Sequence, residues 1–345
     1  MRKFLCSVLL ITLVAVVLGC AAPAPEAPAP AAPAPAKTIT LTMVSFGPKT
    51  ASDSATVVRV AEKLQNLSRG ELIIDYKGGP EVIPTFEQME ACKTGVVDLV
   101  QTGMAYMVGF APEFMYGTAA GVYDRPAERE MGIFDAWDRV CQQYVNTKFL
   151  AQQNGGKYAP MTIFSNRKVE KLADLKGQRV RGAPHYLPFL DKLGVEMITM
   201  PFGEMYEAME RSVIDGFCFP VTAGPVSIFK MNEVAKYVVL PETGFVYQDA
   251  MWMMNLDKWN ELPEHLQTLL SEVGEDSEYW SYYLHTTNLE KEMKLFEETG
   301  VEVCNLSPDE KKWWIENVRL AYLEHMKENL SPESYATLSP MLIPK

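Results

Sequence analysis

The chain has 345 residues, of which 48% are hydrophobic, and its formal net charge is −12. This length and composition supply enough apolar surface for one large domain or two intermediate ones. The negative charge argues against nucleic acid and anionic lipid as partners, because both repel an acidic surface.

The N-terminus has the features of a secretion signal that ends in a cysteine. A basic pair precedes an apolar run over Phe4–Leu18, and Gly19 leads to Cys20. The run is shorter than the ~20 residues that a membrane-spanning helix needs, and its basic start is typical of a signal peptide. The segment Val17–Cys20 resembles a bacterial lipobox, although Leu18 stands where a small residue is usual.

Residues 20–37 continue as a tether rich in proline and alanine. Such repeats favour extended polyproline II at ~3.1 Å per residue, so residues 21–36 would reach on the order of 50 Å. We therefore predict a signal peptide over 1–19, a lipid on Cys20, and a folded body held off a membrane in the periplasm or cell envelope. An uncleaved membrane anchor, or cleavage without lipid attachment, is the alternative.

The first part of the folded body alternates between strand and helix patterns. Strands are expected at 38–44, 71–76 and 96–101, and helices at 51–66 and 86–93. Helix-spaced apolar residues alternate here with short strand-like segments, which is typical of a parallel sheet with helices on its faces.

The same alternation returns after a helix predicted over 129–150. The later expected strands are 157–165, 179–181, 195–200, 213–219, 236–246 and 251–255. The later expected helices are 184–193, 202–211, 263–300 and 308–329. Two α/β lobes with late returning strands suit a protein with a cleft between its lobes.

The cysteines and histidines give little support to an enzyme. Four cysteines of the folded body (Cys92, Cys141, Cys218 and Cys304) lie far apart, so buried thiols are the default interpretation and one disulfide is the alternative. The sequence has no Gly-x-Ser-x-Gly elbow, phosphate loop, Gly-x-Gly-x-x-Gly or metal cluster. Of the four histidines, only His185 is placed near a candidate site, and His265, His285 and His325 are expected at the surface or an interface.

The polar residues are densest between Asp174 and Pro220. A turn at 174–177 leads into a strand that carries Arg179 and Arg181, whose side chains point the same way because strands have a period of two. An arginine at the C-terminal end of a strand, beside a helix start, can hold a carboxylate with two hydrogen bonds. A surface salt bridge is the competing interpretation for either arginine.

Several segments resemble the signature of the DctP-type substrate-binding proteins of tripartite ATP-independent periplasmic (TRAP) transporters. The main ones are Asp174–Arg181, Leu193–Gly194, Met200–Met209 and Val213–Gly216. Three further segments match family landmarks: Thr94–Asp98, Val234–Tyr237 and Asn255–Trp259. The similarity covers roughly residues 38–330.

This resemblance implies a two-lobed α/β fold of the periplasmic binding protein type, similar to its type II class. Each lobe is expected to hold a mainly parallel sheet with flanking helices, and the long helix over 263–300 would connect the lobes. The expected boundaries place 38–160 and 246–286 in lobe I, and 161–245 and 287–345 in lobe II.

The resemblance also implies which residues bind a ligand. Arg181 matches the arginine that holds the ligand carboxylate, and Phe202 matches an aromatic residue that packs against the ligand. Met161 stands where the sialic-acid members carry a second arginine, and Cys218 where the oxo-acid members carry a metal-binding acid. We therefore expect Arg181 to act alone, without a metal or cofactor, against an apolar wall that includes Phe219.

Lobe I is expected to contribute residues from the ends of its strands. Ser45 and Phe46 end the first strand, and Gly103 and Tyr106 follow the third. Tyr106 aligns with a tyrosine that contacts the ligand in the oxo-acid group, and Trp252 on a crossing strand could line the cleft. Packing in the core is the alternative for each of these residues.

Taken together, these features predict an extracytoplasmic solute-binding lipoprotein rather than an enzyme. It would capture a small organic acid, deliver it to a TRAP membrane permease and attach to a membrane only through its lipid. A receptor that feeds a sensor kinase or chemoreceptor, an exported α/β enzyme and a structural envelope lipoprotein are the alternatives. The sequence leaves the identity of the acid open.

Overall fold

The computed structural model describes residues 37–117, 125–154, 161–240 and 249–342. The predicted signal peptide, Cys20 and the tether up to residue 36 lie outside these ranges, as do parts of the strands expected at 157–165 and 236–246. Within the described ranges, none of the helices combines the length and the hydropathy of a membrane span.

The first sheet has five strands in the order β2-β1-β3-β10-β4. These strands are β1 (Ile39–Ser45), β2 (Leu72–Gly78), β3 (Leu99–Thr102), β4 (Thr147–Asn154) and β10 (Asp249–Asn255). β1 pairs in parallel with β2 and β3, as the alternation of strands and helices predicted. β10 returns late in the chain and runs antiparallel to both β3 and β4, so the sheet is mixed.

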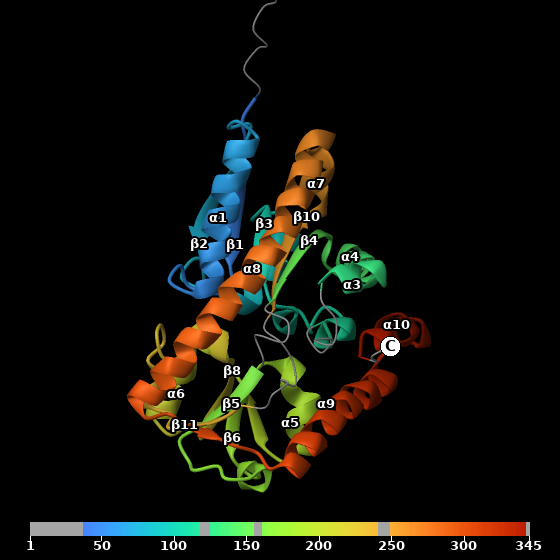
Figure 1. The fold of residues 1–345 in the computed structure, drawn as a ribbon. Helices are drawn as coiled ribbons and strands as arrows, with labels where there is room; N and C mark the ends of the chain where they lie inside the picture. The colour runs from blue at the N-terminus through green and yellow to red at the C-terminus, as the bar shows by residue number, and fades with distance from the viewer. Residues whose placement is uncertain (1–36, 118–124, 155–160, 241–248, 343–345) are drawn as a thin grey trace, which may run out of the picture. The chain divides into compact units, whose positions relative to one another are not determined.

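The second sheet has six strands in the order β11-β9-β5-β8-β6-β7. Its strands are β5 (Met161–Ser165), β6 (Arg179–Gly182), β7 (Glu196–Thr199), β8 (Gly216–Pro220), β9 (Tyr237–Val239) and β11 (Glu302–Cys304). β6 pairs in parallel with β7 and β8, whereas β5 runs antiparallel to both β8 and β9. The expectation of two α/β sheets with flanking helices is confirmed (Figure 1). Both sheets are mixed rather than mainly parallel, because β10 and β5 each run antiparallel to both of their neighbours.

Helices cover the first sheet through their apolar faces. α1 (Ser52–Leu67) contacts β2, α2 (Gln88–Lys93) contacts β3, and α4 (Ile133–Val145) contacts β4. On α1, Val57 and Leu64 are fully buried, as their helical spacing predicted. The other described α-helices are α5 (Leu187–Lys192), α6 (Met205–Glu210), α7 (Leu256–Glu261), α9 (Pro308–Asn329) and α10 (Pro332–Leu338).

The single helix predicted over 129–150 is wrong. The structure has α3 (Arg125–Glu130), then α4, and then β4 from Thr147 onward. Gly132 and Asn146, the residues that flank α4, both adopt the left-handed backbone conformation, which cannot continue an α-helix. The apolar residues beyond Asn146 continued the helical spacing in the sequence, but they belong to the strand.

The long helix expected over 263–300 is confirmed as α8 (Glu264–Thr299), and it contacts elements of both sheets (Figure 1). Two buried carboxylates attach it. Glu278 accepts a hydrogen bond from the backbone N–H of Gln152 in β4, at 2.8 Å. Glu292 accepts one from the backbone N–H of Val226, which follows β8, at 2.9 Å. Each buried charge is therefore hydrogen-bonded, as the low-polarity interior requires.

His285 lies between these two attachments. It was expected at the surface or an interface, and the structure buries it fully where α8 meets the turn after β8. Its Nδ1 lies 2.8 Å from the hydroxyl of Thr222 in that turn. Burial lowers the pKa of His285 to about 4, so the imidazole is neutral at pH 7.

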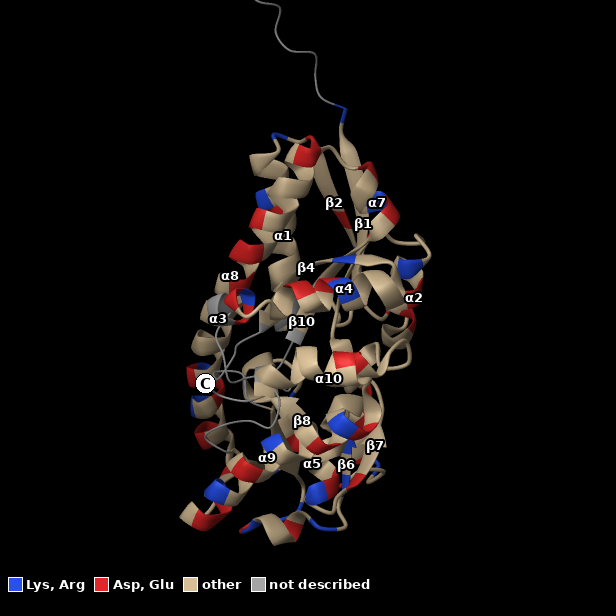
Figure 2. Ribbon diagram, turned by 90° about the vertical axis from the view of Figure 1, so that its right-hand side faces the viewer, with Lys and Arg blue, Asp and Glu red and all other residues tan. Residues whose placement is uncertain are grey.

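The four cysteines of the folded body are free and buried, in line with the default interpretation: Cys92, Cys141, Cys218 and Cys304. On the outside, acidic and basic residues are interspersed along α8 and α9 (Figure 2). One example is the ion pair between Lys63 of α1 and Asp276 of α8, at 2.6 Å. Such an exposed pair contributes little stability.

Candidate functional site

Arg181 lies near the C-terminal end of β6 and is only 2% exposed. Among the lysines and arginines whose burial the structure describes, it is the one that is buried. In the sheet it stands opposite Ile198 of β7 and Phe217 of β8, and residues that face each other across neighbouring strands share a side of the sheet. The guanidinium therefore emerges on an apolar face.

Two backbone carbonyls orient this guanidinium. Nε donates a hydrogen bond to the carbonyl of Met200 at 2.9 Å, and Nη1 donates one to the carbonyl of Cys218 at 3.3 Å. No carboxylate in the described ranges forms an ion pair with Arg181. A buried cation without a counter-ion is unfavourable, so the arrangement favours binding of an anion.

Two phenylalanines follow the residues that hold Arg181. Phe202 comes two residues after Met200, and Phe219 comes one residue after Cys218. Their ring centroids lie 6.2 Å apart. The two chain segments whose carbonyls hold the Arg181 guanidinium therefore also carry these two rings.

Rings from the first sheet meet those of the second. Phe46, which follows β1, lies 5.9 Å from Phe202. Tyr106, in a 3₁₀ turn after β3, lies 6.0 Å from Phe46. Gly103 is buried and begins that turn, where its carbonyl accepts a hydrogen bond from the backbone N–H of Tyr106 at 3.0 Å.

Six side chains form a chain of ring contacts with centroid distances from 5.1 to 6.2 Å. We call them the aromatic group: Phe46, Phe86, Tyr106, Phe202, Phe219 and Phe229. The sequence analysis missed Phe86 and Phe229. Phe86 lies in the 3₁₀ turn that leads into α2, within the helix expected over 86–93, and Phe229 lies in a turn. Only their contacts with predicted residues identify them.

Ser45 and Trp252 have other contacts. The Ser45 hydroxyl donates to the carbonyl of Gly47 at 2.9 Å and lies 2.5 Å from the Tyr76 hydroxyl, so it stabilises the loop after β1. The Trp252 indole donates to the side chain of Gln153 at 2.9 Å. Trp252 packs in the core that α1 and α8 cover, so the structure does not bring it to the aromatic group.

His185 lies in the 3₁₀ turn that follows Arg181 and is 4% exposed. Its Nδ1 has no hydrogen-bond partner in the described part of the chain. Burial, followed by the positive charge of Arg181, holds the pKa of His185 well below its usual value. The neutral imidazole therefore adds no second charge beside Arg181 at pH 7.

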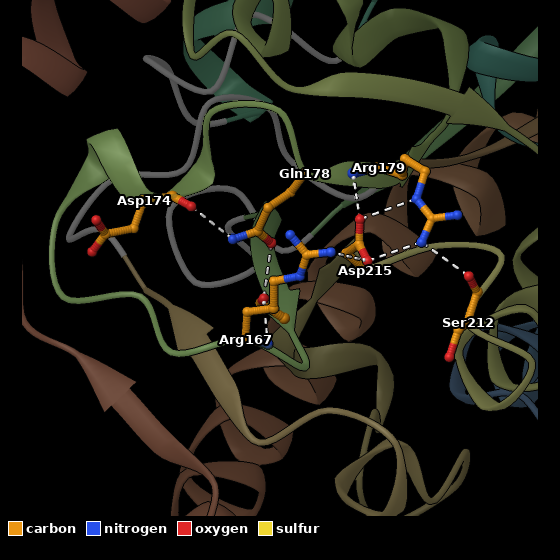
Figure 3. A network of polar contacts seen from close by, with 7 residues as sticks. Arg167, Asp174, Gln178, Arg179, Ser212 and Asp215 are labelled. Carbon is orange, nitrogen blue, oxygen red and sulfur yellow. Dashed lines mark hydrogen bonds and ion pairs between the residues drawn. The ribbon is translucent and has the colours of Figure 1, made fainter.

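The opposite end of β6 carries a different polar network (Figure 3). The guanidinium of Arg179 donates to both oxygens of Asp215, at 3.0 and 3.1 Å, and Arg167 donates to the same carboxylate at 2.9 Å. The hydrogen bond from Arg179 lowers the pKa of Asp215 below its ordinary value. This region holds its charges in a closed network.

The described residues contain no cluster of three or more histidine, cysteine, aspartate or glutamate side chains that could hold a metal ion. The chemistry that they do offer around Arg181 is recognition of an anion by a buried guanidinium beside aromatic rings.

The chain resembles known families along most of its length. The family model described as bacterial extracellular solute-binding protein, family 7 (DctP), matches residues 45–329. A monocarboxylate 2-oxoacid-binding periplasmic protein of Nostoc sp. is 22% identical over 231 residues, which make up 66% of this chain and 63% of that protein. The 2,3-diketo-L-gulonate-binding periplasmic protein of Escherichia coli is 32% identical over 142 residues, 40% of this chain and 42% of that protein.

Solved structures share the fold. A TRAP periplasmic solute-binding protein of Desulfovibrio salexigens with bound orotic acid superposes with a TM-score of 0.75 at 19% identity, over 88% of this chain and 99% of that chain. The sugar acid binding protein of Advenella mimigardefordensis in complex with galactonate gives a TM-score of 0.76 at 18% identity, over 89% of this chain and 98% of that one.

Proposed function

Because this chain belongs to the DctP family, bacterial extracellular solute-binding protein family 7, we propose that it captures a small organic acid outside the cytoplasm and delivers it to a TRAP-type membrane permease. It acts as a binding protein and not as an enzyme. Its relatives include periplasmic proteins named for binding a 2-oxoacid and a diketo sugar acid.

The observation that carries this proposal is the environment of Arg181. The guanidinium is buried, is oriented by the carbonyls of Met200 and Cys218, and has no carboxylate partner in the described part of the chain. A ligand carboxylate supplies the missing negative charge. Hydrogen bonds to charged groups contribute ~1.5–3 kcal/mol each, so this one contact accounts for a large share of the affinity.

The ligand is enclosed between two lobes. In this proposal lobe I comprises 38–160 and 246–286, and lobe II comprises 161–245 and 287–345. Support comes from the contact between Phe46 of the first lobe and Phe202 of the second. Closure removes water from the ion pair, which strengthens it.

A lipid on Cys20 and the tether that follows it hold the protein at a membrane in the periplasm or cell envelope. Tethering raises its effective concentration at the permease. Fractionation of cells tests this part: the Cys20→Ser variant should move from the membrane fraction to the soluble fraction, and its retention in the membrane would contradict the lipid anchor.

The main test compares two arginines of the same strand. A thermal-shift screen of organic acids first identifies a carboxylate that binds. Calorimetry with that acid should then show a loss of roughly two orders of magnitude or more in affinity for Arg181→Ala, at ~1.4 kcal/mol per factor of ten. Arg179→Ala is the matched control and should keep its affinity within a few-fold. Equal binding by wild type and Arg181→Ala would overturn the proposal.

A further inference from the structure

The charge around Arg181 limits how many acidic groups a ligand can carry. Arg181 is the one buried cation among the lysines and arginines whose burial is described, and His185 beside it is neutral at pH 7. A second carboxylate on the ligand would be buried without a counter-ion. Because an uncompensated buried charge is strongly unfavourable, the site suits a ligand with a single negative charge.

The aromatic group limits the polarity of the rest of the ligand. Phe46, Phe202 and Phe219 are each less than 10% exposed, and their side chains offer no hydrogen-bond donor or acceptor. Two hydroxyls at the strand ends already donate to the protein. Thr162, opposite Phe219 in the sheet, donates to the Phe219 carbonyl at 3.0 Å, and Ser45 donates to the Gly47 carbonyl. Ligand hydroxyl groups that lie against these three phenyl rings would lose their water without replacement.

The rings of the aromatic group contact one another in tilted and edge-to-face geometries, which aromatic pairs favour. Phe202 contacts Phe46 at an interplanar angle of 64°, Phe229 at 89° and Phe219 at 33°. Edge-to-face and offset contacts between rings add to the gain from buried area. Phe46 follows β1 of the first sheet, whereas Phe202 follows β7 and Phe219 lies in β8 of the second sheet. Separation of the two sheets would therefore expose ring faces to a ligand.

We propose that the ligand is a monocarboxylate with a flat, apolar ring, and that dicarboxylates and polyhydroxylated sugar acids are rejected. This inference rests on the proposed function, because it places the ligand carboxylate on Arg181. The ring lies among Phe46, Phe202 and Phe219, near the strand ends whose carbonyls hold the guanidinium.

Calorimetry with three probes tests this class directly. Benzoate has one charge and a flat ring, succinate has two charges and no ring, and D-galactonate has one charge and several hydroxyl groups. We expect benzoate to bind at least about 100-fold more tightly than succinate or D-galactonate, because one unpaired buried charge or several unpaired hydroxyls each cost more than that factor.

Variants of Phe219 test the ring contact. Phe219→Leu keeps an apolar side chain and should weaken benzoate binding about threefold to tenfold through loss of the aromatic contact. Phe219→Asn should weaken it further, and melting without ligand shows whether that variant is folded. Phe110→Leu is the control, since Phe110 packs in a separate cluster, and it should leave benzoate binding unchanged.

The outcomes separate this inference from the proposed function. If succinate or D-galactonate binds as tightly as benzoate and loses affinity in Arg181→Ala, the ring inference is wrong and the proposed function stands. If benzoate binds equally well to Arg181→Ala, or no carboxylate in the organic-acid screen binds, the proposed function fails and the inference fails with it. Equal benzoate affinity in Phe219→Leu, Phe219→Asn and wild type also overturns the ring inference.

Discussion

The two ends of strand β6 use the same residue type in opposite ways. Arg179 and Arg181 are two residues apart and start on the same face of the sheet. Arg179 is partly exposed, yet it is fully engaged with Asp215 and with the carbonyl of Ser212. Arg181 is buried, yet its described partners are two neutral carbonyls.

This difference shows that a buried arginine need not have a carboxylate partner, and that a partly exposed arginine can have one. At the Arg179 end, the turn before β8 brings in a carboxylate that forms ion pairs with two arginines, and the result is a closed structural network (Figure 3). At the Arg181 end, the carbonyls of Met200 and Cys218 orient the cation without neutralising it. The first arrangement stabilises the fold, and the second leaves the cation available for the anion that we propose as its ligand.

The largest expected effect on the contrast between the two ends of β6 comes from the removal of Asp215. In Asp215→Ala, Arg179 loses the hydrogen bonds of its guanidinium and its backbone N–H to the carboxylate, and Arg167 loses its ion pair. We expect the free energy of unfolding to fall by about 2 kcal/mol, less than for a fully buried pair because water reaches both arginines. Chemical denaturation measures this loss.

The same variant should bind its acid with unchanged affinity at a temperature where it is folded. Asp215 directly precedes β8, whereas the ligand site that we propose lies at the other end of that strand. A drop in affinity that parallels the loss of stability would mean that the two ends are coupled, and the separation into a structural end and a binding end would be wrong.

A conservative substitution of Arg181 should have a smaller effect, and it should change ligand affinity rather than stability. Arg181→Lys keeps the positive charge but loses the planar fork that bonds both Met200 and Cys218. We expect about a tenfold loss of affinity, or ~1.4 kcal/mol, with little change in stability. Calorimetry measures the affinity, and a melting curve of the same variant measures its stability. If Arg181→Lys binds as well as wild type, charge alone is sufficient and the orienting carbonyls are unimportant.

The sequence predicted most elements of the fold because periodic apolar residues mark strands and helices locally. It did not predict the strand order, because the return of β10 between β3 and β4 depends on long-range pairing. The error over 129–150 arose since Phe149 and Leu150 continue a helical spacing, while the left-handed conformation of Asn146 ends the helix. Local conformation overrode the pattern there.

For the candidate site, the sequence indicated which residues lie at strand ends, but it did not indicate which face of the sheet their side chains occupy. The place of Arg181 at a strand end, together with the family resemblance, made it the candidate for binding the ligand carboxylate. Trp252 also lies on a strand, but alternation alone does not say which face of the sheet α1 and α8 cover. Phe229 was missed because it lies in a turn, where no spacing links it to Phe202 and Phe219.

The smallest expected effect is an acid dependence of stability confined to the Arg179 end. The hydrogen bond from Arg179 lowers the pKa of Asp215 below the 3.8 of an ordinary carboxyl. The stabilisation by the ionised Asp215 is therefore complete above that value and is lost as the pH falls through the lower pKa of the folded state.

The free energy of unfolding of wild type and Asp215→Asn should be compared across acidic pH, where the difference between the two proteins should shrink as the pH falls. His285, whose pKa is about 4, affects both proteins and cancels in the difference. A difference that stays constant would show that Asp215 carries no special charge interaction, and the two ends of β6 would then no longer differ in how they hold an arginine.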